Sequence, residues 1–127
     1  MRTDISLAPR NSLVLVMDHS YGEVPESMGE RSIAFNESCV AVGTLSEQDG
    51  TTETTLSDEA DVPPDCNLIF DGTVVTPSMK LSVCAVNDEV LLSIPTSSGE
   101  SKLRIYSNDG TEPNKIVILV DQETSGD

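Results

Sequence analysis

Residues 79–86 read M-K-L-S-V-C-A-V, and apolar side chains alternate there with polar or smaller ones at period two. In an extended chain this spacing places one apolar set on a single face: Met79, Leu81, Val83 and Ala85. The pattern recurs at 31–35, 38–45, 52–56 and 102–106. Such alternation indicates β-strands that lay one face against a core and the other toward solvent.

Two further stretches, L-V-L-V-M at 13–17 and I-V-I-L-V at 116–120, are apolar without interruption. Their β-branched content and short length favour strands over helices. An uninterrupted apolar strand is typical of a position covered on both faces. We therefore expect these two segments to lie inside the molecule.

Glycine and proline mark the connections between these strands. Asp71-Gly72 separates N-L-I-F from T-V-V-T and predicts a tight two-residue hairpin, because glycine adopts positive φ at low cost. Asp49-Gly50 is expected to turn strand 38–45 onto strand 52–56. The segment 25–31 allows at most one helical turn, since it contains Pro25 and Gly29.

Together these signals predict an all-β fold, an antiparallel two-sheet β-sandwich with at most one short helical turn. A chain of 127 residues is the size of one domain with a real core. We expect a single sandwich domain over 1–121 and a flexible C-terminal tail over 122–127.

The charge of the chain is unusual in sign. Seven basic and twenty-two acidic residues give a formal net charge of −15. Residues 32–79 include nine acids and no Lys or Arg. This balance argues against nucleic acid or an anionic membrane as a partner, because binding phosphates requires Lys and Arg. It favours solubility, metal cations or a basic protein surface.

We predict that the acidic stretch 46–66 meets a basic protein, because opposite charge steers and accelerates association. The residues expected to carry this role are Glu47, Asp49, Glu53, Asp58, Glu59, Asp61 and Asp65. Tight binding also needs a few buried apolar anchors. Candidates within or beside the acidic loops are Tyr21, Leu56, Val62 and Met28.

No catalytic motif is recognised, and we predict a protein that is not an enzyme and needs no cofactor. Asp18-His19-Ser20 has the residue types of a hydrolytic triad, but consecutive residues of an extended chain do not converge. An open alternative is a structural or adhesion module that binds calcium through acidic loops. Its candidate ligands are Asp58, Glu59 and Asp61 in one loop, and Asn108, Asp109 and Glu112 in another.

The three cysteines, Cys39, Cys66 and Cys84, are odd in number and widely spaced. They predict buried apolar residues in preference to disulfides or a metal site. No apolar stretch has the length of a signal peptide or a membrane span. We therefore expect a cytoplasmic protein that does not contact a membrane.

Several segments follow one another in a recognisable order: I-S-L, L-V-L-V-M-D, R-S-I-A-F, D-G-T-V-V-T-P-S-M-K-L-S-V, E-V-L-L-S-I-P-T-S-S-G-E and K-L-R-I-Y. Their order and spacing resemble the family of competence protein J, a bacterial inhibitor of a DNA-entry nuclease. The resemblance implies a small β-sandwich that inhibits a nuclease or acts as an immunity protein against a toxin. This chain departs from the family in lacking Trp and in having few aromatic residues, and no functional residue transfers by position.

The predicted function is therefore a non-enzymatic acidic protein that covers a basic surface of a nuclease or toxin. The sequence leaves the oligomeric state open between a monomer and a homodimer, since a like-charged edge strand discourages pairing without forbidding it.

Overall fold

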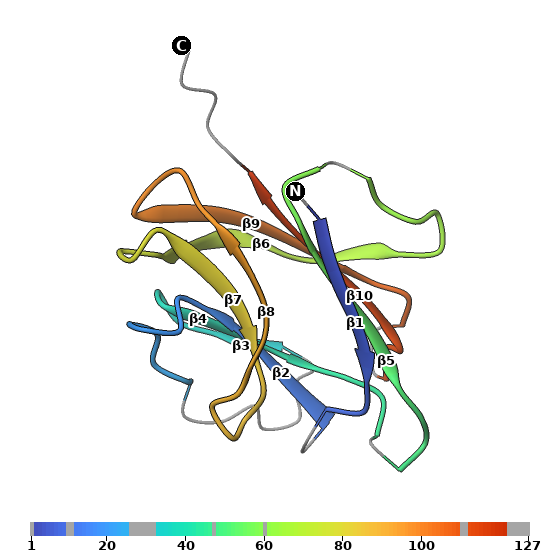
Figure 1. Cartoon of the computed structure of the whole chain (residues 1–127). Coiled ribbons are helices and arrows are strands. Elements are labelled where there is room, and N and C mark those ends of the chain that lie inside the picture. Colours follow the sequence, from blue (N-terminus) through green and yellow to red (C-terminus); the bar gives the residue numbers. More distant parts are fainter. Residues whose placement is uncertain are drawn as a thin grey trace.

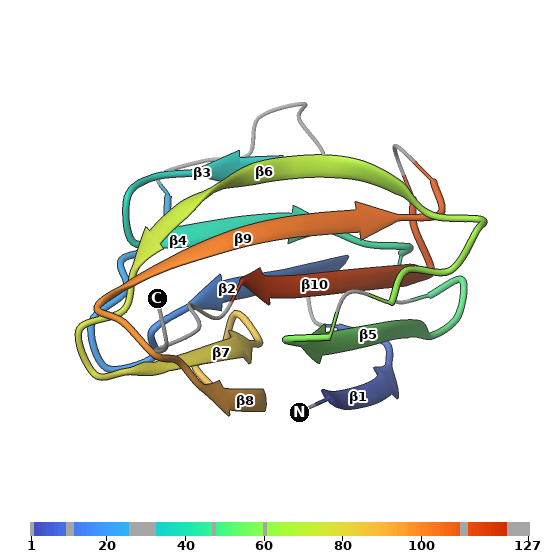
Figure 2. The same ribbon diagram turned by 90° about the horizontal axis from the view of Figure 1, so that it is seen from above.

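The structure is a computed structural model that describes residues 2–9, 12–25, 33–46, 48–59, 61–109 and 112–121. These residues form ten strands: β1 (Arg2–Leu7), β2 (Leu13–Met17), β3 (Ile33–Phe35), β4 (Cys39–Gly43), β5 (Thr52–Ser57), β6 (Asn67–Val75), β7 (Lys80–Cys84), β8 (Val90–Pro95), β9 (Glu100–Ser107) and β10 (Lys115–Asp121). They build two packed sheets, so the predicted all-β sandwich is confirmed (Figures 1 and 2). Among the described residues no helix has the length and apolarity to span a membrane.

Each sheet has five strands. The first sheet has the order β1-β5-β10-β9-β6, and the second has the order β3-β4-β2-β7-β8. All pairings are antiparallel except that of β5 with β10, which is parallel. The predicted helical turn at 25–31 and the tail at 122–127 fall almost entirely outside the described residues.

The core lies between the sheets. Its largest fully buried side chains come from both: Leu56, Leu81, Ile94, Leu103, Ile105, Ile116 and Ile118. Strand β10 is buried from Ile116 to Val120, and β2 is buried from Val14 to Met17. The prediction that both segments are covered on two faces is therefore confirmed. Cys39, Cys66 and Cys84 are buried free thiols.

The prediction of a hairpin at Asp71-Gly72 is wrong. Strand β6 continues through both residues and pairs with β9 from Asn67 to Val75. Gly72 serves packing instead, because a Cβ there would lie 2.7 Å from the ring of Phe70. Glycine thus allows the Phe70 ring to lie against the strand's own backbone.

Two further predictions, on the Asp49-Gly50 turn and on the start of the strand at Met79, differ from the structure in detail. Asp49-Gly50 does form a turn, with Gly50 at φ 141°, but it joins β4 of the second sheet to β5 of the first. The two strands are therefore not hairpin partners. Met79 lies in the turn before β7 with φ 61°, so the alternating pattern starts one residue later than the sequence suggests.

Candidate protein-binding surface

The acidic connection between β5 and β6 crosses the outer face of the first sheet. Val62 is half-buried in this connection and packs against Cys66, Val117 and Leu119, an apolar cluster on that face. Val62 therefore holds the connection down on the sheet. It is a structural contact, and its remaining exposed part is what a partner would meet.

Two of the predicted contact acids are already paired with bases. Asp61 lies 3.5 Å from the Arg2 guanidinium, and Asp65 lies 3.2 Å from Lys115 Nζ. The hydrogen bond to Asp65 and its charge raise the pKa of Lys115. The sequence stretch 46–66 has no base of its own, but the fold supplies two bases from other strands.

The outer face of the first sheet carries both signs of charge. Four of the seven basic residues of the chain lie there or on its rim: Arg2, Lys102, Arg104 and Lys115. Arg104 pairs with Asp121 at 3.0 Å. We call this surface the mixed face. Bases pair with several of its acids, so the negative charge of this face is partly offset.

An acidic end lies where the β4–β5 turn meets the β9–β10 loop. Leu45 N donates to Pro113 O at 2.8 Å, and Glu53 N donates to Asn114 O at 2.8 Å, which joins the two connections. The acids of this region are Asp49, Glu53, Asp109 and Glu112, all exposed. Neither residues 44–51 nor residues 108–114 include a Lys or Arg. The negative charge of this end thus has few bases nearby to offset it, apart from Lys115.

The predicted apolar anchors lie in different parts of the structure. Leu56 requires a correction: it is 0% exposed and points into the core, so it offers nothing to a partner. Tyr21 is 50% exposed but belongs to the loop after β2 in the second sheet, away from the 58–66 connection. Met28 and Glu47 lie outside the described residues. Asp58 is half-buried, and Glu59 is exposed.

Asp18, His19 and Ser20 have structural partners. Asp18 is buried, and its carboxylate accepts hydrogen bonds from Ser20 N at 3.0 Å and Ser78 N at 2.8 Å. His19 Nε2 lies 3.1 Å from a carboxylate oxygen of Asp88. The three side chains do not form a nucleophile–base–acid chain, because Asp18 contacts the backbone of its neighbour and of the β6–β7 turn.

Replacing Asp18 by Asn is expected to cost about 2 kcal/mol of unfolding free energy near neutral pH, since hydrogen bonds to a charged acceptor are lost. Burial alone would raise the pKa of Asp18, but the hydrogen bonds from Ser78 and Ser20 outweigh it and lower the pKa below its usual 3.8. The stabilisation is therefore complete above pH 3.8 and is lost as the pH falls through the lowered pKa. Urea unfolding of both forms at a series of pH values measures this.

We expect the difference in unfolding free energy between the two proteins to become smaller below pH 3.8. Asp88→Asn is the control, because it removes an exposed carboxylate nearby. A difference in unfolding free energy that does not change as the pH falls below 3.8 would show that the Asp18 charge does not stabilise the fold.

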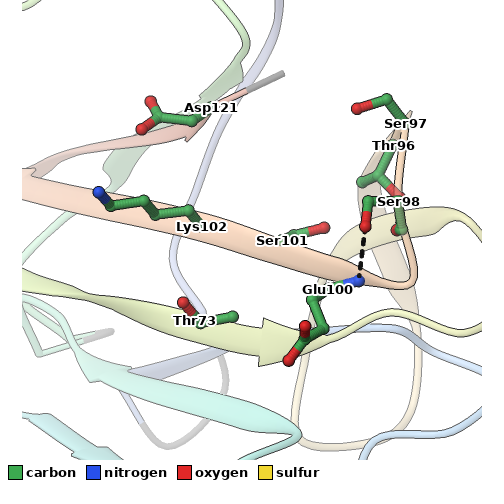
Figure 3. A pocket seen from close by; sticks show the side chains of 8 residues that line it. All are labelled: Thr73, Thr96, Ser97, Ser98, Glu100, Ser101, Lys102 and Asp121. Carbon is green, nitrogen blue, oxygen red and sulfur yellow. Dashed lines mark hydrogen bonds between the residues drawn. The ribbon is translucent and has the colours of Figure 1, made fainter. Parts of the chain in front are cut away.

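A hollow of about 350 Å³ lies beside the β8–β9 turn. Hydroxyl groups and charges of both signs line it: Thr73, Thr96, Ser97, Ser98, Ser101, Glu100, Lys102 and Asp121. Figure 3 shows the hydroxyls of the turn near the start of β9, where Glu100 N donates to Ser98 Oγ at 3.2 Å. Its hydroxyls have no histidine beside them, and its opposed charges favour neither an anion nor a cation.

Two of the six candidate calcium ligands, Asn108 and Asp109, serve as turn residues. Asn108 Oδ1 accepts hydrogen bonds from Asn114 N and Lys115 N, and Asp109 Oδ1 accepts from Glu112 N. Within the described residues no group of three or more His, Cys, Asp or Glu side chains is arranged to hold a metal. The side chains of Asn108 and Asp109 thus close the turn of the 108–114 loop.

Sequence reasoning missed an exposed aromatic side chain. Phe35 is 62% exposed on β3, and its ring meets that of Phe70 on β6 in an edge-to-face contact with centroids 5.1 Å apart. The alternation of R-S-I-A-F places Phe35 on the same face as Ile33, opposite the core residue Val40, and the ring is exposed because β3 is an edge strand. The meeting of the two rings depends on the sheet topology, which the sequence did not reveal.

Comparison with known proteins finds relatives by fold alone. No protein-family model and no curated sequence matches the chain. The solved structure of ComJ from Bacillus subtilis, described as an inhibitor of the DNA degrading activity of NucA, is similar with a TM-score of 0.67. It is 7% identical, with 95% of this chain and 96% of that one covered. The product of crocagin biosynthetic gene J has a TM-score of 0.51 at 13% identity, covering 97% and 96%.

Proposed function

From the sandwich shared with ComJ, we propose that this chain is a non-enzymatic inhibitor that covers a basic surface of a nuclease. The observation that carries the proposal is the fold match over 95% of the chain to a protein described as a nuclease inhibitor. At 7% identity the match establishes the fold, and the step to function rests on charge as well.

The charge distribution supports this step. A nuclease holds DNA phosphates with Lys and Arg, and an acidic protein that covers that groove replaces the phosphates. The acidic end provides Asp49 and Glu112 on loops without Lys or Arg, and Glu53 at the start of β5, opposite Lys115, whereas acids of the mixed face are paired with bases. Complementary charge of this kind accelerates association by about tenfold to a thousandfold at low salt. We assign the acids of the acidic end to this steering role.

The proposed setting is the cytoplasm. Three buried thiols without a disulfide suit a reducing compartment.

Capture from host extract tests the proposal. The immobilised chain is expected to retain a basic nuclease at about 0.1 M salt and to release most of it at about 0.5 M salt, because salt screens the attraction. Replacing three acids of the acidic end, Asp49→Asn, Glu53→Gln and Glu112→Gln, should slow association with that nuclease about threefold to tenfold. Association rates by surface plasmon resonance measure the change.

The matched control removes the same charge from the mixed face: Asp4→Asn, Asp71→Asn and Asp121→Asn. This control variant is expected to change the association rate much less, because bases lie close to these three acids. Retention that is independent of salt, or equal slowing by both triple variants, would remove the electrostatic basis of the proposal.

A further inference from the structure

The side of the sandwich formed by β3 and β6 presents a rigid aromatic side chain. These strands are edge strands of opposite sheets and lie side by side (Figure 2). The rings of Phe35 and Phe70 meet between them. Phe70 is half-buried, packs on the core and lies over Gly72, where a Cβ would lie 2.7 Å from the ring. Phe35 is therefore held in place by a fixed neighbour although 62% of it is exposed.

The loop after β2 brings two more exposed apolar side chains to this side. Asn36 Nδ2 donates to Glu23 O at 3.0 Å, and Glu23 N donates to Ser38 Oγ at 2.9 Å. These bonds tie the segment 21–24 alongside the β3–β4 turn, directly after Phe35. Tyr21 is 50% exposed and Val24 is 53% exposed. We call this surface, made of Tyr21, Val24, Phe35 and Phe70, the aromatic edge.

The carboxylates around the aromatic edge have no base from their own segments. Glu23 and Glu37 are exposed, and with Tyr21 and Ser38 they line a hollow of about 160 Å³. Residues 11–30 and 32–79, which supply both segments and both edge strands, include no Lys or Arg. The hollow thus combines a phenol ring with two carboxylates, which is the environment that a guanidinium group prefers.

We propose that the aromatic edge is the surface that anchors the basic partner, with an arginine side chain of the partner in the hollow beside Tyr21. Phe35 and Val24 would contact apolar side chains next to that arginine. Exposed aromatic residues ringed by polar groups are typical of the few positions that hold an interface together. The inference rests on the proposed function, and it moves the anchoring contact away from the 58–66 connection.

A second copy of this chain is a poorer occupant. Each copy carries a formal charge of −15, and pairing through this edge would bring the Glu23 and Glu37 carboxylates of both copies together. Like charges at a shared interface are destabilising, whereas a cationic protein gains from the same carboxylates.

Titration of the full chain with a capped peptide of alternating Arg and Leu, followed by NMR, tests the surface. We expect the amide shifts to concentrate at Tyr21, Glu23, Phe35 and Glu37, and the same peptide with Gln in place of Arg to cause none. The variant Phe35→Ser and the double variant Glu23→Gln, Glu37→Gln should each weaken binding about fivefold.

The matched control removes two charges elsewhere, by Asp49→Asn and Glu112→Gln. The affinity for the peptide is expected to change by less than about twofold, because at about 0.1 M salt charges beyond roughly 10 Å are screened. Three results would each overturn the inference. The first is amide shifts spread over the acidic end, and the second is an equal loss of peptide affinity in the two double variants. The third is a dimer of the chain that the variant Phe35→Ser dissociates.

The inference and the proposed function can fail separately. If the chain inhibits a nuclease and Phe35→Ser inhibits it equally well, the aromatic edge is not the anchor and the function stands. If the peptide binds at the edge and no nuclease is inhibited, the surface stands and the nuclease is the wrong partner.

Discussion

Leu56→Ala is expected to destabilise the chain by about 3 kcal/mol and to lower its thermal midpoint by roughly 10 °C. Leu56 lies on β5 between β1 and β10, pairs with Ile118, and is fully buried in the main core. Truncating a buried leucine loses its transfer free energy and leaves a cavity that the neighbours fill only in part. Such a loss lowers the ratio of folded to unfolded molecules by about a hundredfold.

Thermal and urea unfolding followed by circular dichroism measure this change. Leu68→Ala is the matched control, because it makes the same chemical change in the same sheet at a side chain that is 50% exposed. The control is expected to shift stability by less than about 1 kcal/mol. Equal and small effects from both substitutions would mean that Leu56 is accessible and that the position of β5 is incorrect.

The strands could be predicted well from the sequence because periodicity reports burial directly. Residues 13–17 and 116–120 are apolar throughout, and both are central strands covered on two faces. The prediction of a hairpin at Asp71-Gly72 was wrong for a local reason. A glycine permits a turn, but it also permits a ring to lie on the strand, and only the position of Phe70 distinguishes the two.

The candidate site was harder to predict because it depends on which strands become neighbours. The acids of 46–66 are visible in the sequence, yet Lys115, which pairs with Asp65, lies 50 residues further along the chain. Leu56 adjoins acidic residues in sequence, and strand alternation turns it inward. Tyr21 was selected from its surroundings in the sequence, but its proposed companion Phe35 is recognisable only once β3 is an edge strand.

Addition of the purified chain to an extract of host cells that lack it is expected to abolish most of the DNA-degrading activity of one nuclease. The acidic end speeds the encounter, and the aromatic edge holds the complex. Loss of the anchor should shorten the lifetime of the complex more than it slows its formation. The variant Phe35→Ser should therefore require about tenfold more protein for the same inhibition. The acidic-end triple variant should act more slowly and reach a similar final level.

The most direct test of the central claim is the rate of degradation of labelled double-stranded DNA in that extract, titrated with the chain at about 0.1 M and about 0.5 M salt. The account predicts near-complete, saturable inhibition at the lower salt concentration, weaker inhibition at the higher one, and little inhibition by an equal amount of the Phe35→Ser variant. Degradation that continues undiminished when the chain is in large excess at low salt would contradict it.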